Sequence, residues 1–280
     1  MKVSIISILL LSSHLLLAQS GWVKDKNQLY AQVSYTSFKS EDYYSLDGEL
    51  LDVASFKQRS VGIYAEYGLG NRLALEYNQV LYRSNGFNTT ETVSGFGDVF
   101  IGLKYALNKG NFPVSITVGP EIPIGNSDLV SRNLDDPSTF LFLPTGDGEW
   151  NILNTIAASH SIDNIYFSLF TTFNLRTEYQ GNDFSNQLRS GLEIGYSPTE
   201  KLWLQAKSRI QITFGDEPAS TDILRGEGTE FSLFELGGSY AIAKNYLIIG
   251  NTSFYSDFLV SRKNLYSAPV FSLGLAFTMN

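Results

Sequence analysis

Cysteine is missing from this sequence of 280 residues, and histidine occurs only twice. The first absence excludes disulfide bonds, a thiolate nucleophile, a cysteine-based metal site and a lipid anchor on a modified cysteine. His14 falls within the predicted export signal described below, so the mature chain keeps His160 alone. One histidine without cysteine cannot form a zinc site of the usual kind. We therefore expect no metal site and no cofactor.

Long apolar runs are also missing beyond the amino terminus, so the mature chain has no candidate transmembrane helix. At the amino terminus, Lys2 precedes an apolar run over residues 3–17, and the small residues of Ala18-Gln19-Ser20 follow it. This order is typical of a signal peptide, and the run is short for a retained membrane helix. We predict a signal peptide over residues 1–20, cleaved after Ala18 or Ser20, and a single domain over residues 21–280. Any membrane residence of that domain has to be as a β-barrel.

Positive charge is scarce, because 20 basic residues stand against 28 acidic ones and the formal net charge is −8. An acidic chain without a basic stripe binds nucleic acid poorly, so we expect no nucleic-acid partner. Much of the acid falls in three predicted loops, where a divalent-cation site is one interpretation and a solvated surface the other. We favour the solvated surface because the spacing matches no calcium-binding loop. The acidic residues in question are Glu41, Asp42, Asp47, Glu49, Asp52, Asp128, Asp135, Asp136, Asp147, Glu149, Asp216, Glu217, Asp222, Glu227 and Glu230.

The stretch Gly95–Leu107 shows the pattern that recurs along the chain. From Val99 on, every second residue is large and apolar, and those between are small or charged apart from Phe100. A period of two predicts a strand with one apolar and one polar face. The registers near 72–83, 149–160 and 245–256 stay unassigned, because alternation is poor there. The twelve predicted strands cover residues 28–39, 59–69, 72–83, 97–107, 112–122, 149–160, 165–177, 187–197, 201–214, 230–242, 245–256 and 268–278.

The connections between these strands alternate strictly between long and short. Short periplasmic turns and long outer loops on an even number of antiparallel strands describe an outer-membrane barrel of a Gram-negative bacterium. The predicted fold is therefore all-β: a transmembrane, antiparallel, up-and-down barrel of about twelve strands in the cell outer membrane. Its expected partners are outer-membrane lipid and lipopolysaccharide, together with the barrel-assembly machinery, which a closing strand such as Phe271–Phe277 suits. The long connections cover residues 40–57, 84–95, 123–148, 178–186, 215–229 and 257–267.

Two motifs resemble a known family. Gly-Phe-Gly-Asp at Gly95–Asp98, continued by Gly-Leu-Lys-Tyr at Gly102–Tyr105, is similar to a strand opening in the outer-membrane transporters associated with the meta-pathway of phenol degradation. The proline-containing stretch Pro120–Gly125 resembles that family as well. The resemblance implies a barrel that passes small, often hydrophobic molecules. Long-chain fatty-acid channels are a more distant likeness, because only Ser20–Gln28 precede the first predicted strand, too few residues for a plug domain.

Charged residues of both signs fall on the face predicted to line the lumen. One interpretation is a constriction that selects solutes by charge and hydrogen bonding. The other is an interior held together by ion pairs, which we favour for most of these residues because unpaired charges are costly in a narrow lumen. Lys207 and Arg209 are the strongest candidates for a selectivity element. The predicted inward-facing charges are Glu66, Asp98, Lys104, Arg176, Glu178, Arg189, Glu193, Lys207, Arg209 and Glu235.

The longest loop, over residues 123–148, carries the apolar run Phe140, Leu141, Phe142 and Leu143 before Pro144. Such a run is unusual in an exposed loop, so it either folds into the lumen as a gate or sits on the membrane interface. The pair of Ser159 or Ser161 with His160 invites comparison with outer-membrane serine–histidine lipases. We favour a histidine at the periplasmic rim that bonds backbone or water, because the next predicted turn is a short one.

The sequence therefore predicts a passive channel or transporter for small and often hydrophobic molecules, with no enzymatic activity. The alternative is a non-conducting structural or adhesion barrel that binds a partner through its long acidic outer loops.

Overall fold

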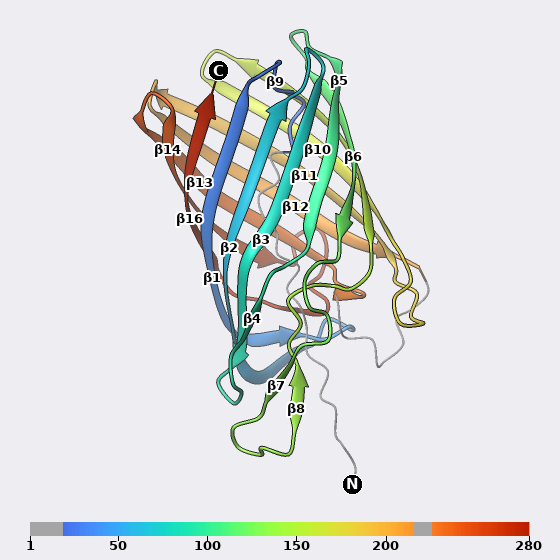
Figure 1. Ribbon diagram of the computed structural model, residues 1–280. Coiled ribbons are helices and arrows are strands. Elements are labelled where there is room, and N and C mark those ends of the chain that lie inside the picture. Colours follow the sequence, from blue (N-terminus) through green and yellow to red (C-terminus); the bar gives the residue numbers. More distant parts are fainter. Residues whose placement is uncertain (1–18, 216–225, 280) are drawn as a thin grey trace.

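The chain forms a closed barrel of twelve antiparallel strands, seen in a computed structural model that describes residues 19–215 and 226–279 (Figure 1). The last barrel strand pairs with the first, and the first also pairs with the second, so the sheet has no free edge. The barrel strands are β1 (Leu29–Tyr44), β2 (Leu50–Gly68), β3 (Leu73–Phe87), β5 (Val99–Asn108), β6 (Val114–Ile122), β9 (Asn151–Ile162), β10 (Ile165–Arg176), β11 (Asn186–Thr199), β12 (Leu202–Phe214), β13 (Phe231–Ala243), β14 (Tyr246–Ser256) and β16 (Val270–Met279). The remaining strands are short and lie in the connections: β4 (Val93–Gly95), β7 (Val130–Arg132), β8 (Phe140–Phe142) and β15 (Leu265–Tyr266). The predicted fold class and the strand number are confirmed.

The first hairpin differs from the prediction, because most of the expected loop over residues 40–57 is strand. β1 and β2 keep pairing up to Tyr44 and Leu50, past a bulge between Ser40 and Asp42. The chain reverses over residues 45–49, where Gly48 has a φ of 81° that favours glycine. The outer part of this hairpin is rich in Ser, Asp and Glu, so its composition resembles that of a loop although its backbone continues the ladder.

Apolar residues cover the outside of the barrel, and polar residues fill much of its inside. Val33, Leu103, Leu169, Leu236 and Leu273 point outward and are 46–62% exposed. Large aromatic residues are exposed near both ends of the strands. This inside-out arrangement, with aromatic girdles, is that of a transmembrane barrel. The girdle residues are Tyr67, Phe112, Tyr196, Tyr240 and Tyr246 near the short turns, and Tyr82, Phe96, Trp150, Phe214 and Phe258 near the long connections.

The two ends of the barrel differ as the alternation of connections predicts. The short turns lie at the end where β16 finishes, and the β7–β8 hairpin projects at the opposite end (Figure 1). By the architecture of outer-membrane barrels, the first end is periplasmic and the second is extracellular. In the two described ranges, no helix is both long enough and apolar enough to cross a membrane.

Two predictions lie outside the described residues. One is the signal peptide, apart from its last positions, because the description begins at Gln19. The other concerns the acidic residues Asp216, Glu217 and Asp222, which belong to the undescribed part of the connection between β12 and β13.

Candidate functional site

The candidate site is the lumen, which three layers of side chains divide from the outer mouth to the periplasmic end. An apolar cluster lies under the outer loops, a ladder of ion pairs crosses the middle of the barrel wall, and two adjoining cavities lie toward the periplasm. Each layer uses the inward-facing half of the strand alternation.

Lys104 lies between two carboxylates on the wall formed by β2, β3 and β5. Its Nζ atom is 3.2 Å from Glu66 Oε2 and 3.0 Å from Glu76 Oε1. The Lys104 side chain is 1% exposed, and those of Glu66 and Glu76 are 7% and 8% exposed. A cation this enclosed offers almost no surface to a solute. The geometry of Lys104 therefore fits an ion pair that holds three strands together.

Lys207 and Arg209 face the lumen from the opposite wall and are paired with acids on the neighbouring strands. Lys207 Nζ is 2.6 Å from Glu193 Oε2 on β11, and Arg209 Nη2 is 3.6 Å from Glu235 Oε2 on β13. These four side chains are 10–17% exposed, so they border open space and are not sealed in the wall. Of the predicted selectivity residues, Glu193 and Lys207 line a lumen cavity, and Arg209 is partly exposed beside them.

Two further arginines lie closer to the outer mouth. Arg189 donates hydrogen bonds to amide oxygens, from Nε to Gln211 at 2.9 Å and from Nη2 to Gln187 at 2.7 Å. Arg176, at the end of β10, binds Glu149 Oε1 at 2.6 Å and Glu227 Oε2 at 2.9 Å.

The Arg176 cluster ties the outer connections to the end of β10. Burial, with the Asp147 charge adding to it, raises the pKa of Glu149 to about 7 although Arg176 acts in the other direction. Glu149 and Glu227 are therefore buried partners of Arg176. This corrects the expectation that these two loop acids lie on a solvated surface. Glu178, predicted to face inward, instead lies beyond the end of β10 and is exposed.

Asp98 also belongs to the outer end of the lumen, because it lies just before β5. Its two carboxylate oxygens accept hydrogen bonds from the backbone N–H groups of Gly125, at 2.9 Å, and Asp147, at 2.7 Å. Burial and the nearby Asp147 carboxylate raise the pKa of Asp98 to about 6, against the lowering effect of these hydrogen bonds and of Arg83. Asp98 thus fastens both ends of the long loop over residues 123–148.

That loop sends part of its apolar run into the barrel mouth. Leu141 is 5% exposed and Leu143 is 1% exposed, whereas Phe140 is 47% exposed and Phe142 is half-buried. The split follows from β8, in which successive side chains point to opposite faces. We call the packed group the outer-mouth cluster: Phe38, Tyr43, Phe56, Phe87, Leu141, Leu143, Phe231, Leu233, Tyr255, Leu265 and Tyr266.

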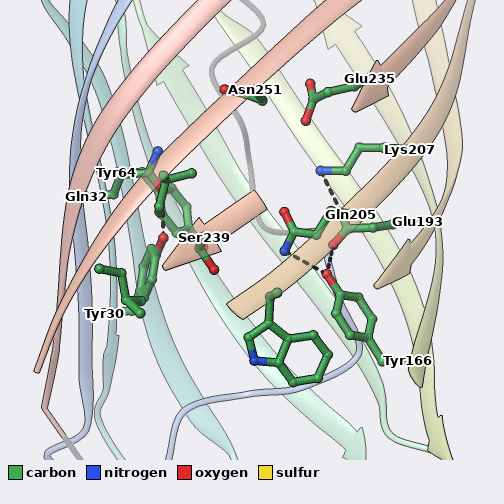
Figure 2. Close-up of a pocket in the computed structure, with 13 residues that line it drawn as sticks. Tyr30, Gln32, Tyr64, Tyr166, Glu193, Gln205, Lys207, Glu235, Ser239 and Asn251 are labelled. Carbon is green, nitrogen blue, oxygen red and sulfur yellow. Dashed lines mark hydrogen bonds and ion pairs between the residues drawn. The ribbon is translucent and has the colours of Figure 1, made fainter. Parts of the chain in front are cut away.

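Two adjoining cavities occupy the periplasmic half of the lumen, with volumes of about 300 and 560 Å³. Figure 2 shows Tyr30 and Tyr64, from β1 and β2, across the cavity from Tyr166, Glu193 and Lys207. The Tyr166 hydroxyl donates to Glu193 and accepts a hydrogen bond of 2.9 Å from Gln205. The ring centroid of Tyr166 is 5.4 Å from that of Trp203.

Our sequence reasoning missed these aromatic residues as part of the site. Tyr30, Tyr64 and Tyr166 occupy the polar, inward-facing positions of their strands. An aromatic residue at such a position could have served as the signal. It was obscured by the general abundance of aromatic residues in a chain with 16 Tyr and 19 Phe.

Neither serine beside His160 is hydrogen-bonded to it. The His160 ring bonds the backbone oxygen of Asn111 at 2.7 Å and packs against Phe112 at the periplasmic rim. Ser159 points into the lumen, where its hydroxyl is 2.7 Å from that of Ser168. Adjacent strand residues face opposite sides of the wall, so His160 and Ser159 are directed apart.

The described residues contain no group of three or more histidine or acidic side chains arranged to hold a metal ion. Of the loop acids, Glu230 forms an ion pair with Lys263 at 3.0 Å.

Comparison with solved structures shows that this fold is that of outer-membrane channels and porins. An outer-membrane channel from Pseudomonas putida F1 superposes with a TM-score of 0.67 and 15% identity, over 92% of this chain and 97% of that chain. The NanC porin gives a TM-score of 0.52 and 11% identity, over 90% of this chain and 100% of that chain. The CymD monoaromatic hydrocarbon channel gives 0.50 and 11%, over 92% of this chain and 90% of that chain.

No protein-family model and no curated protein sequence matches the chain. The predicted resemblance to an outer-membrane transporter family is confirmed at the level of the fold. The chain has the β-barrel fold of outer-membrane channels and porins.

Proposed function

We propose that this protein is a passive channel for small molecules. The observation that supports this most is the pair of adjoining cavities inside a closed, polar lumen. They share Tyr30, Tyr64, Tyr166, Glu193 and Gln205 as lining residues, so open space continues from one to the other. A purely structural barrel would gain stability from filling such space with side chains.

The cavity walls favour small molecules without a net charge. The lumen charges bordering the cavity are paired, Glu193 with Lys207 and Glu235 with Arg209, so they create little net field. Aromatic rings and amide groups face the same space, which suits a molecule with both apolar and hydrogen-bonding parts. The CymD channel is described as a channel for monoaromatic hydrocarbons, and that description supports solutes about as large as one aromatic ring.

Within this proposal, Lys207 and Arg209 are the selectivity residues, because they border the open lumen. Lys104, Arg176 and Asp98 act structurally, the first in the barrel wall and the other two as anchors of the outer loops. Leu141 and Leu143 form the gate, because their burial in the outer-mouth cluster holds the loop over residues 123–148 across the mouth.

The proposed role is not enzymatic, and the direction of His160 away from Ser159 supports that view. We propose outer-membrane lipid and lipopolysaccharide as the partners of the exposed apolar belt, and the barrel-assembly machinery as the partner during insertion. The transported solute is the remaining partner.

A non-conducting adhesion barrel is the second candidate. The observation that favours it is the exposed apolar surface on the outer loop, where Val130, Leu134 and Phe140 are 45%, 56% and 47% exposed. A protein partner could cover such a surface.

Conductance of purified protein in planar lipid bilayers distinguishes the two. The channel proposal predicts discrete, stepwise conductance from folded protein. An adhesion barrel predicts that folded, heat-modifiable protein inserts without conductance steps, and that result would overturn the proposal.

A further inference from the structure

The smaller lumen cavity, of about 300 Å³, has aromatic rings on two sides. Tyr166 on β10 and Trp203 on β12 line one side, with 5.4 Å between their ring centroids and 50° between the ring planes. Tyr30 and Tyr64 lie across the cavity from Tyr166, with ring centroids 6.0 Å apart (Figure 2). A molecule of one ring that enters this space therefore meets aromatic surface on both sides.

Hydrogen bonds hold two of these rings in place. The Tyr166 hydroxyl donates to Glu193 and accepts from Gln205 at 2.9 Å. The Tyr30 hydroxyl donates to Gln32 Oε1 at 2.7 Å. Because the bonded hydroxyl groups restrict movement of the rings, the aromatic faces are positioned before a solute arrives, and binding costs less conformational entropy.

Hydrogen-bonding groups line the same cavity. Lys207 Nζ lies 2.6 Å from Glu193 Oε2. An ammonium group has three N–H donors and a carboxylate has about four acceptor positions, so this pair retains capacity for the hydroxyl groups of a solute. Glu235, Ser239 and Asn251 add further polar groups. Oδ1 of Asn251 has no hydrogen-bond partner among the described residues, and a bound hydroxyl group can supply the missing bond.

This combination suits a sugar ring better than a hydrocarbon ring. A pyranose has C–H groups on its faces and hydroxyl groups around its edge, and each hydroxyl both donates and accepts. It therefore matches aromatic faces and polar groups at once. A hydrocarbon ring would cover the Glu193–Lys207 pair and Glu235 without bonding them, and this loss of hydration opposes its binding. The pairing of the charges favours a sugar without net charge.

We propose that this cavity is a binding site for a neutral pyranose sugar. One C–H face of the sugar lies on the rings of Tyr166 and Trp203, and its hydroxyl groups bond Glu193, Lys207 and Asn251. This inference rests on the proposed channel function, which leaves the solute class open, and it names neutral sugars as the solutes.

Tryptophan fluorescence tests the site without depending on conduction. The chain has three tryptophans, so Trp22→Phe with Trp150→Phe leaves Trp203 as the reporter. This folded protein, in an amine oxide detergent that contains no sugar, is titrated with D-glucose. The Trp203 fluorescence should change saturably, because the bound ring covers the indole. D-Mannitol is an open-chain polyol and cyclohexanol is a ring with a single hydroxyl group. Each should bind at least roughly tenfold more weakly than glucose.

Substitutions in the reporter background locate the site. Tyr166→Leu removes one aromatic face and should weaken glucose binding roughly tenfold. Tyr196→Leu is the matched control, because Tyr196 is 44% exposed on the outside of the neighbouring strand β11 and should not affect glucose binding. If Tyr166→Leu does not fold, Asn251→Leu removes a polar group of the cavity from β14 and should weaken glucose binding as well.

Liposome swelling in glucose, measured on the same protein, separates the two proposals. A saturable glucose response that Tyr166→Leu weakens and Tyr196→Leu keeps supports the sugar site. Absence of a saturable response to glucose, or a response to cyclohexanol at equal concentration, overturns the sugar site, and swelling above the protein-free rate then leaves the channel function standing. A glucose response without swelling overturns the channel function, and with it the assignment of sugars as transported solutes.

Discussion

Asp98 and Gly125 are 27 residues apart in the chain, yet Oδ1 of Asp98 lies 2.9 Å from the backbone nitrogen of Gly125. The second carboxylate oxygen holds the N–H of Asp147, so a single side chain fixes both ends of the loop that enters the outer mouth. Sequence motifs often mark such anchors, and here the aspartate closes the Gly95–Asp98 motif.

The first prediction concerns the pH dependence of stability. The folded-state pKa of Asp98 is raised from 3.8 to about 6. The stabilising contribution of Asp98 to the free energy of unfolding is therefore fully present below about pH 4. It is lost as the pH rises through about 6, where the buried carboxyl group ionises. The charges acting on Asp98 are the Asp147 carboxylate and the Arg83 guanidinium. Asp98→Asn should abolish this part of the difference between pH 4 and pH 8 in detergent unfolding experiments. The same pH difference in both proteins would contradict the assignment.

The second prediction concerns the gate at the outer mouth. Leu141→Ser with Leu143→Ser should release the loop from the outer-mouth cluster, because each leucine loses about 1.5–3 kcal/mol of burial free energy. Conductance and the solute size limit should both rise. Phe140→Ser is the control, because that side chain is 47% exposed on the opposite face of β8. If the double substitution folds and conducts like the control, the loop does not gate.

The third prediction concerns the enclosed ion pairs of Lys104. Lys104→Met leaves Glu66 and Glu76 buried without their cation, which should lower the free energy of unfolding by roughly 3–5 kcal/mol. Lys39 and Glu41 form an exposed ion pair, with side chains that are 57% and 63% exposed. Lys39→Met breaks this pair and should lower the free energy of unfolding by at most about 1 kcal/mol. Urea unfolding in lipid vesicles measures both. Equal effects would mean that the Lys104 pairs are solvated.

The fourth prediction concerns which face of the wall meets lipid. Leu236, halfway along β13, is 55% exposed on the outside, so Leu236→Arg should cost roughly 2–4 kcal/mol in a bilayer. Asn251→Arg places the same charge in the lumen cavity that Glu235 also lines and should be tolerated. Similar destabilisation by both substitutions would contradict the inside-out arrangement.

The strand number and barrel closure could be predicted from the sequence because both follow from local signals. Alternation marks most of the strands, and loop length distinguishes the two ends. Where alternation fails, the structure shows why in one case: Val61 pairs with Tyr82 and Gly62 with Val80, so Leu81 is an extra residue in β3 that shifts its register. A bulge depends on pairing and leaves little trace in a single strand.

The interior was predictable only in part, because contacts between distant residues decide it. The alternation placed Lys104, Lys207 and Arg209 on the inner face. It could not reveal that Lys104 is enclosed by Glu66 and Glu76 while Lys207 borders a cavity, because that depends on the neighbouring strands.

Liposome swelling with a series of neutral solutes tests the central claim most directly. Vesicles that contain the folded protein should swell in neutral solutes that contain one ring. The swelling rate should fall steeply for solutes with two or three rings, because the lumen cavities measure about 300 and 560 Å³. Vesicles without protein provide the baseline. Swelling at the baseline rate with every solute, from vesicles shown to hold folded barrel, would contradict the account of this protein as a passive channel.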